Sequence, residues 1–218
     1  MPLDSERFEA KDFSTLEKLK EDLLLIDKLV KEYNKTYSLN FSEFNVIDNI
    51  NRIFQSFKSI KHYKKTFVLE AYKTSKNSYL CLVINNYILQ NVHVIDANNN
   101  AVIKYSEETD FEFVAFIGLK KDLGEVFIRK ETLGEKINEL ISPIETDFIE
   151  NNEFSKKFYV LGNSEEKLRA NVDKKFFDAF LSHPGIEVEI NGEFMMARFR
   201  KNFSKETGEQ LLDFMSHF

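Results

Sequence analysis

The sequence predicts an α+β fold, with an N-terminal antiparallel helical hairpin followed by an antiparallel β-sheet covered by helices. Three observations predict it. Apolar residues recur with helical spacing up to about residue 65. From residue 66 onward, short runs rich in Val, Ile, Phe and Tyr alternate with polar residues, and no helix-length segment separates them as it would in a parallel sheet. The last third of the chain mixes both patterns. These observations divide the chain into a hairpin, residues 1–65, and an α+β domain, residues 66–218, with a single globular unit as the alternative.

The first element is a long helix over residues 13–37. Its apolar residues alternate steps of three and four, which is the heptad spacing of a coiled coil. The opposite face is densely charged, as expected for a face in water. The seam consists of Leu16, Leu19, Leu23, Ile26, Val30, Tyr33 and Tyr37.

A second helix is predicted from Ser42, a suitable N-cap residue, to His62. Its apolar stripe includes Ile47, Ile50 and Phe54. The connection over residues 38–41 is short, so we expect the two helices to fold back on each other as an antiparallel hairpin.

The middle of the chain is predicted to be a meander of short strands, because β-branched and aromatic residues are concentrated there between polar breaks. The predicted strands are Phe67–Tyr72, Tyr79–Ile84, Val92–Ile95, Val102–Tyr105, Phe111–Gly118 and Val126–Arg129.

The last third is predicted to contain three helices, one lone strand and a hairpin. Asn191-Gly192 is a strong signal for a two-residue hairpin turn. The three helices span residues 132–141, residues 164–182 (ended by His183-Pro184-Gly185) and residues 205–217; the strands are Phe158–Leu161 and, in the hairpin, Ile186–Ile190 and Phe194–Phe199.

Composition excludes several function classes. Cys81 is the only cysteine and lies in an apolar run, so neither a disulfide nor a multi-cysteine zinc site is expected. The first half of the chain has no glycine with which to build a phosphate-binding loop. The four histidines are scattered, and no metal or cofactor is predicted. No export signal and no apolar run of membrane-spanning length is found, which indicates a cytoplasmic protein.

Two local patterns have both a functional and a structural interpretation. Residues from Asp96 to Glu107 have the oxygen-ligand spacing of a calcium loop, but Ala101 stands where that loop needs glycine, so a hairpin turn is favoured. Glu187 and Glu189 share one face of a predicted strand, and an ion pair with Arg198 on a solvent-exposed face is favoured over an acid/base pair.

The stretch from Arg52 to Lys76 is strongly basic, with a net charge of +6 inside a chain of net charge −6. Aromatic residues are interleaved with the basic ones, as in sites that contact phosphates and stack on bases. The candidate binding residues are Lys58, Lys61, Lys64 and Lys65. A solvated, solubilising helix end is favoured over such a site, because lysines near a helix C-terminus complement its dipole.

Residues 154–201 follow the pattern Phe154-x-Lys156-x-Phe158-x-Val160, then Glu166 and Arg169, an aromatic helix and the closing hairpin. This stretch resembles a bacterial domain family of unknown function, many of whose members are anchored in the membrane by N-terminal helices. The resemblance implies no catalytic residues. Because the N-terminal helices of this chain are amphipathic, no membrane span is expected.

These patterns favour a non-enzymatic binding or scaffold protein that self-associates as a homo-oligomer through residues 13–37, with a protein partner. The first alternative is a module that binds a polyanion such as nucleic acid through the basic stretch, although the net charge of the whole chain opposes it. The second is an acidic inhibitor or immunity-type protein that masks a partner.

Overall fold

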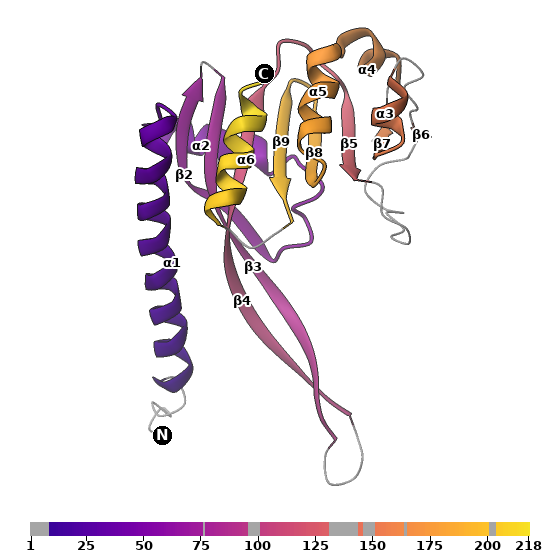
Figure 1. Cartoon of the computed structure of the whole chain (residues 1–218). Coiled ribbons are helices and arrows are strands. Elements are labelled where there is room, and N and C mark those ends of the chain that lie inside the picture. Colours follow the sequence, from indigo (N-terminus) through magenta and orange to yellow (C-terminus); the bar gives the residue numbers. More distant parts are fainter. Residues whose placement is uncertain are drawn as a thin grey trace. The chain divides into compact units, whose positions relative to one another are not determined.

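The structure is a computed structural model that describes residues 9–75, 77–95, 101–130, 144–145, 151–163, 165–200 and 204–218. It is an α+β protein with one large antiparallel sheet and several helices (Figure 1). The described elements form two compact units, of which the first ends at Leu39 and the second begins at Asn40. In chain order they are α1 (Glu9–Thr36), β1 (Asn40–Phe41), α2 (Phe44–Phe54), β2 (Lys65–Ser75), β3 (Ser78–Ile95), β4 (Ala101–Gly118), β5 (Glu125–Lys130), β6 (Ile144–Glu145), α3 (Asn152–Ser155), β7 (Phe158–Gly162), α4 (Glu165–Asn171), α5 (Lys174–Ser182), β8 (Ile186–Asn191), β9 (Phe194–Phe199) and α6 (Lys205–Met215).

The first unit contains α1, a continuous helix of 28 residues. A helix was predicted over residues 13–37, and α1 covers that range except for its last residue. All seam residues from Leu16 to Tyr33 therefore lie on one helix. The unit boundary falls at residue 39, whereas the sequence pattern placed a domain boundary at residue 65.

The predicted helical hairpin is not confirmed. The segment between the two helices is β1, which pairs with β2 through Asn40 and Phe41. The second helix also ends at Phe54, not at His62, and begins after Glu43 without a side-chain cap from Ser42. The backbone N–H of Ser42 donates instead to the carbonyl of Ala71 on β2, which continues the strand pairing.

The second unit is built on a nine-stranded antiparallel sheet with the order β1-β2-β3-β4-β9-β8-β5-β7-β6. The predicted antiparallel meander is therefore confirmed in its general form. Its strands are longer than predicted, because Tyr79–Ile84 and Val92–Ile95 are parts of the single strand β3, and Val102–Tyr105 and Phe111–Gly118 are parts of β4. The polar residues between them were interpreted as breaks, but they remain in register, with Asn85 opposite Asp110.

The β3–β4 hairpin extends well beyond its neighbours (Figure 1). Pairing of β2 with β3 ends at Asn86, and pairing of β9 with β4 begins at Ala115. Among the described residues, the outer part of the hairpin is thus a two-stranded ribbon that reaches Ile95 opposite Ala101. Nine residues of extended strand correspond to about 30 Å.

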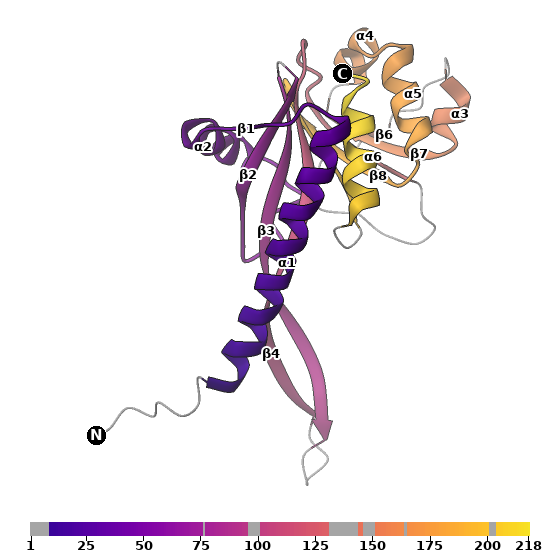
Figure 2. The same cartoon turned by 60° about the vertical axis from the view of Figure 1, so that its left-hand side comes forward.

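Helices cover both faces of this sheet. Figure 2 shows α2 on one side and α3, α5 and α6 on the other. On the α2 side, apolar residues of the helix and of the following segment pack on alternate residues of the strands, as the two-residue repeat of a strand requires. This core comprises Ile47, Ile50, Phe54, Phe57, Ile60, Val68, Ala71, Cys81, Val83, Val114, Phe116 and Met196.

The opposite side is packed largely with phenylalanine rings. Phe154 stacks on Phe158 at 5.0 Å between ring centroids, and Phe180 meets Phe214 edge to face at 5.4 Å. The Phe180–Phe214 contact joins α5 to α6. The orientation of these two helices is therefore fixed by buried aromatic packing.

Three local predictions differ from the structure or lie outside it. The helix predicted over residues 164–182 is two helices, because Asp173 accepts a hydrogen bond from the N–H of Phe176 and begins α5 anew. The predicted hairpin is confirmed, but its turn is Gly192-Glu193, since Asn191 pairs with Phe194. The helix predicted over residues 132–141 lies outside the described residues.

The outer edge of β2 is blocked by side chains of α2. The side-chain amide of Asn51 donates to the carbonyl of Val68 and accepts from its N–H, at 3.0 and 2.6 Å. Gln55 donates to the carbonyl of Thr66 at 2.8 Å. Because these groups are already satisfied, this stretch of the edge is a poor template for pairing with another strand.

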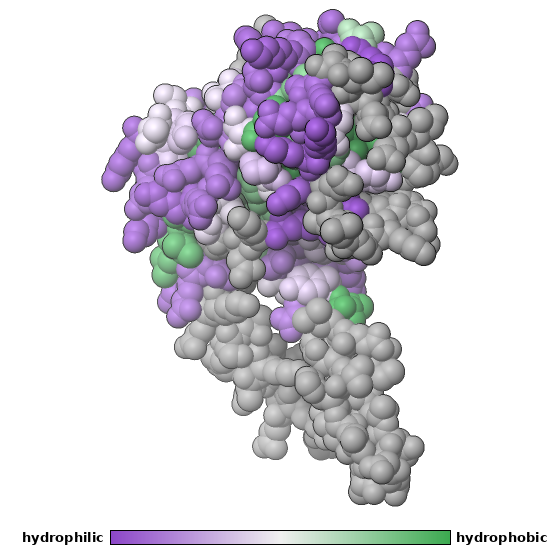
Figure 3. Space-filling model, turned by 45° about the vertical axis from the view of Figure 1, so that its right-hand side comes forward, coloured by the Kyte–Doolittle hydropathy of each residue, from purple (hydrophilic) through white to green (hydrophobic). Residues whose placement is uncertain are grey.

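The surface seen in Figure 3 is mostly hydrophilic, and the hydrophobic residues among those coloured occur only in small, separate areas. In the described part of the chain, no helix combines the length and the apolar character needed to cross a bilayer.

Candidate functional site

A cluster of charged side chains is buried on the α2 side of the sheet, where the segment of residues 55–64 crosses the strands. Arg198 on β9 lies at its centre and is only 3% exposed. Strand neighbours bring the acidic partners to it, since Glu187 stands directly opposite Arg198 and Glu189 is two residues further along β8. Glu112 reaches the cluster from β4.

The guanidinium of Arg198 is shared among several acceptors. Its Nη1 is 3.8 Å from Glu112 Oε2, and its Nε is 3.6 Å from Glu187 Oε2. Nη2 donates to the carbonyl of Ser59 at 3.5 Å. Glu187 is also held at 2.7 Å by Arg200. The arginine thus connects two strands of the sheet to the segment that covers it.

Glu189 fixes that segment directly. Its two carboxylate oxygens accept the backbone N–H groups of Lys58 and Ser59 at 2.6 and 2.8 Å. The carboxylate is buried, and hydrogen bonds from backbone N–H groups to a carboxylate are among the stronger ones in proteins. Glu189 therefore serves as the anchor of the turn that follows α2.

Burial alters the acidity of the groups in this region. Desolvation raises the pKa of Glu112, against the opposing effects of Arg198 and of the amide of Asn85, which donates to Glu112 at 3.1 Å. Desolvation also raises the pKa of Tyr63, whose hydroxyl is hydrogen-bonded to Arg198. The pKa of His62 is lowered, first by desolvation and then by Arg198.

Beside the cluster lies a surface cavity of about 650 Å³, lined by His62, Tyr63, Lys64, Tyr87, Ile88 and Asp110. None of the three cluster glutamates lines it. Each of those glutamates is already engaged by an arginine, an amide or backbone N–H groups. The cluster glutamates therefore hold the covering segment in place, and the acidic and basic groups that line the cavity itself are Asp110, His62 and Lys64.

This finding corrects one prediction. The pairing of Glu187 with Arg198 is as expected in kind, but the face is buried under residues 55–64 and is not solvent-exposed. The two residues are also directly opposite each other, not diagonal, because the turn is displaced by one residue. The sequence pattern does not reveal this cover, because it assigns residues 55–62 to the second helix, whereas α2 ends at Phe54.

The four lysines predicted to bind a polyanion are not equally available. Lys58 forms an ion pair with Glu125 at 2.6 Å, and Lys64 forms one with Glu107, which lowers the pKa of that glutamate. Lys61 and Lys65 are exposed. Elsewhere in the basic stretch, Arg52 pairs with Asp48 at 2.6 Å.

The structure also shows where the single cysteine and the Asp96–Glu107 pattern lie. Cys81 is buried in the core against α2, and burial raises the pKa of its thiol, so it is an unreactive packed group. For Asp96 to Glu107 the sequence favours a hairpin turn over a calcium loop. Residues 101–107 belong to β4 and β3 ends at Ile95, whereas a calcium loop of that kind lies between helices. Residues 96–100 themselves lie outside the described residues.

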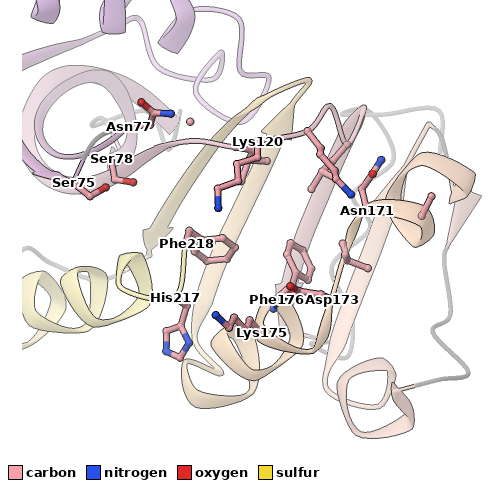
Figure 4. Close-up of a pocket in the computed structure, with 16 residues that line it drawn as sticks. Ser75, Asn77, Ser78, Lys120, Asn171, Asp173, Lys175, Phe176, His217 and Phe218 are labelled. Carbon is pink, nitrogen blue, oxygen red and sulfur yellow. Dashed lines mark hydrogen bonds between the residues drawn. The ribbon is translucent and has the colours of Figure 1, made fainter.

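A second cavity, of about 590 Å³, lies on the opposite side of the sheet (Figure 4). Lys120, Lys121 and Lys175 line it, together with asparagine and serine side chains that can donate hydrogen bonds. Its one carboxylate, Asp173, already caps α5. The side chains that line the cavity thus offer cationic groups and hydrogen-bond donors, which suits a small anion.

Comparison of the chain with protein-family models, with curated proteins and with solved structures finds no significant match. The resemblance of residues 154–201 to a bacterial domain family remains a prediction.

Proposed function

We propose that the protein is a non-enzymatic, cytoplasmic binding or scaffold protein that self-associates as a homo-oligomer through residues 13–37 of α1. The observation that carries this proposal is α1 itself. It is a helix of 28 residues, and its unit contains no second helix or strand among the described residues 9–39.

A helix with an apolar seam gains most of its stability from packing that seam against another surface. The seam of α1 includes Leu16, Leu19, Leu23, Ile26 and Val30. Apolar side chains at heptad spacing can interlock with those of a second helix that has the same spacing. In a two-fold dimer, each chain would bury the same seam residues. Leu23 is 41% exposed, whereas Ile26 and Tyr33 are buried, so the exposed part of the seam around Leu23 is what a second copy of α1 would cover.

The buried charge cluster supports a non-enzymatic role. Its glutamates are engaged by Arg198, Arg200 and two backbone N–H groups, which is the arrangement of a structural anchor. The single cysteine is buried. The lysine-lined cavity of Figure 4 is a candidate site for binding a small anion.

The test is the molar mass of the full chain in solution, measured by light scattering over a range of concentrations. We expect wild type to form an oligomer and Leu23→Asp to be a monomer, because the substitution places a charge in the seam. Lys28→Asp is the matched control, because it adds the same side chain on the opposite face of the helix. A monomeric wild type, or an oligomer that Leu23→Asp leaves unchanged, would remove the proposal.

Polyanion binding remains the second candidate function, and the exposure of Lys61 and Lys65 is what favours it. It predicts nucleic-acid binding that weakens steeply with salt and that is lost on charge reversal of both residues. Reversal of both Lys156 and Lys174, exposed lysines outside the basic stretch, serves as the matched control. A flat titration at low salt would exclude this candidate.

A further inference from the structure

Two histidines and one aspartate meet at the ends of α5 and α6. His183 is the C-cap residue of α5, Asp213 is in the last turn of α6, and His217 follows that helix. One ligand atom from each of these residues lies within 4.8 Å of the other two. Figure 4 shows the ring of His217 between the two helices.

The hydrogen bonds of His183 define what its second ring nitrogen can do. Nδ1 lies 2.7 Å from the carbonyl oxygen of Ala179, and a carbonyl can only accept, so Nδ1 carries a hydrogen. Nε2 lies 3.1 Å from Oδ2 of Asp213. In a neutral imidazole whose hydrogen is on Nδ1, Nε2 carries only a lone pair and would face the lone pairs of the Asp213 carboxylate. The geometry therefore calls for a cation between them, which is either a proton on Nε2 or a metal ion.

We propose that His183, Asp213 and His217 bind one Zn²⁺ ion. Two imidazole nitrogens and one carboxylate oxygen form a ligand set typical of zinc, which leaves a fourth position for water. Magnesium and calcium prefer sites made of oxygen ligands alone. A backbone carbonyl that accepts from the distal N–H of a ligating histidine is the usual outer contact of such sites.

One of the three distances already matches this assignment, and the other two lie within 4.8 Å. Ligand atoms around a tetrahedral zinc ion lie about 3.3 Å apart, close to the 3.1 Å separation of His183 Nε2 and Asp213 Oδ2. His183 is 5% exposed and is fixed by packing against Phe214, whereas the side chain of Asp213 is 62% exposed. The buried ligand is thus preorganised, and the other two can complete the coordination by side-chain rotation. Bound zinc would tie the end of α5 to the end of α6.

The experiment is a zinc titration of the full-length chain after metal has been removed by a chelator, with a chromophoric chelator as competitor. We expect one zinc per chain, and at least about a tenfold loss of affinity in His217→Ala and in Asp213→Asn, since even outer contacts of zinc sites contribute that much. His62→Ala is the control for adventitious histidine binding, because His62 lies in the segment on the α2 side of the sheet, and it should bind zinc like wild type.

Nitrogen NMR of the imidazole rings gives a second readout that needs no variant. Zinc should shift the nitrogen resonance of His183 Nε2, whereas the resonance of Nδ1 should remain that of a protonated nitrogen. Failure to bind zinc at about 100 μM, a concentration far above the dissociation constants of zinc sites with preorganised ligands, would overturn the proposal. Equal affinity in wild type and both ligand variants would overturn it as well.

Discussion

Removal of the Glu189 carboxylate should destabilise the second unit more than any exposed acidic substitution. In Glu189→Ala, the backbone N–H groups of Lys58 and Ser59 lose their acceptors at 2.6 and 2.8 Å. A buried donor left without a partner costs about 1–3 kcal/mol. The N–H of Ser59 is buried and that of Lys58 partly buried, so the two together should cost about 2–5 kcal/mol. Such a loss is a large fraction of the stability of an ordinary domain.

The assay is urea denaturation followed by circular dichroism, since the chain has no tryptophan to report by fluorescence. Glu189→Gln should show a smaller loss, because it keeps one oxygen that can accept a hydrogen bond. Glu193→Ala, on the neighbouring turn and exposed, is the matched control and should stay within about 0.5 kcal/mol of wild type. If Glu189→Ala also stayed within that margin, the anchoring role argued for Glu189 would be refuted.

Two further predictions test other parts of the second unit. Burial raises the pKa of Glu112 in the folded state. The stability that the protonated carboxyl contributes is therefore fully present below the pKa of the unfolded state and is lost as pH rises through the pKa of the folded state. Relative to Glu112→Gln, the wild-type protein should lose stability as pH increases from about 4. An increase over the same range in paired denaturation curves would contradict the burial argument. Gly192 has a φ of +63°, so Gly192→Ala should cost about 1–2 kcal/mol, whereas Gly185→Ala, whose Cβ would make only an ordinary contact with Phe199, should be nearly neutral in the same assay.

Several elements were predictable because their signals are local. The heptad spacing from Leu16 onward marks α1, and Asn191-Gly192 marks the β8–β9 hairpin to within one residue. Ser204 at the start of α6 forms a capping box with Thr207, so the predicted start at residue 205 is correct. Such features depend on neighbours in the chain and are therefore visible in one sequence.

Other features depend on contacts between distant segments. Phe57 and Ile60 continue the apolar pattern of α2, yet they enter the core from turns that Glu189 holds, so the helix was predicted too long. The polar residues in the outer parts of β3 and β4 resemble loop sequence, because among the described residues these parts pair only with each other. Asp213 and His217 stand four residues apart, which is visible in the sequence, whereas His183 joins them only through the packing of α5 on α6.

Disulfide trapping at the seam tests the central claim, that two copies of α1 meet, most directly. The native Cys81 is buried, so a cysteine introduced into α1 is the only accessible thiol. Leu23→Cys, in the seam near the middle of α1, should form a covalent dimer under mild oxidation of the dilute full-length chain, whereas Lys28→Cys on the opposite face should not. If Leu23→Cys gave no covalent dimer, or if Lys28→Cys gave as much covalent dimer as Leu23→Cys, self-association through this helix would be contradicted.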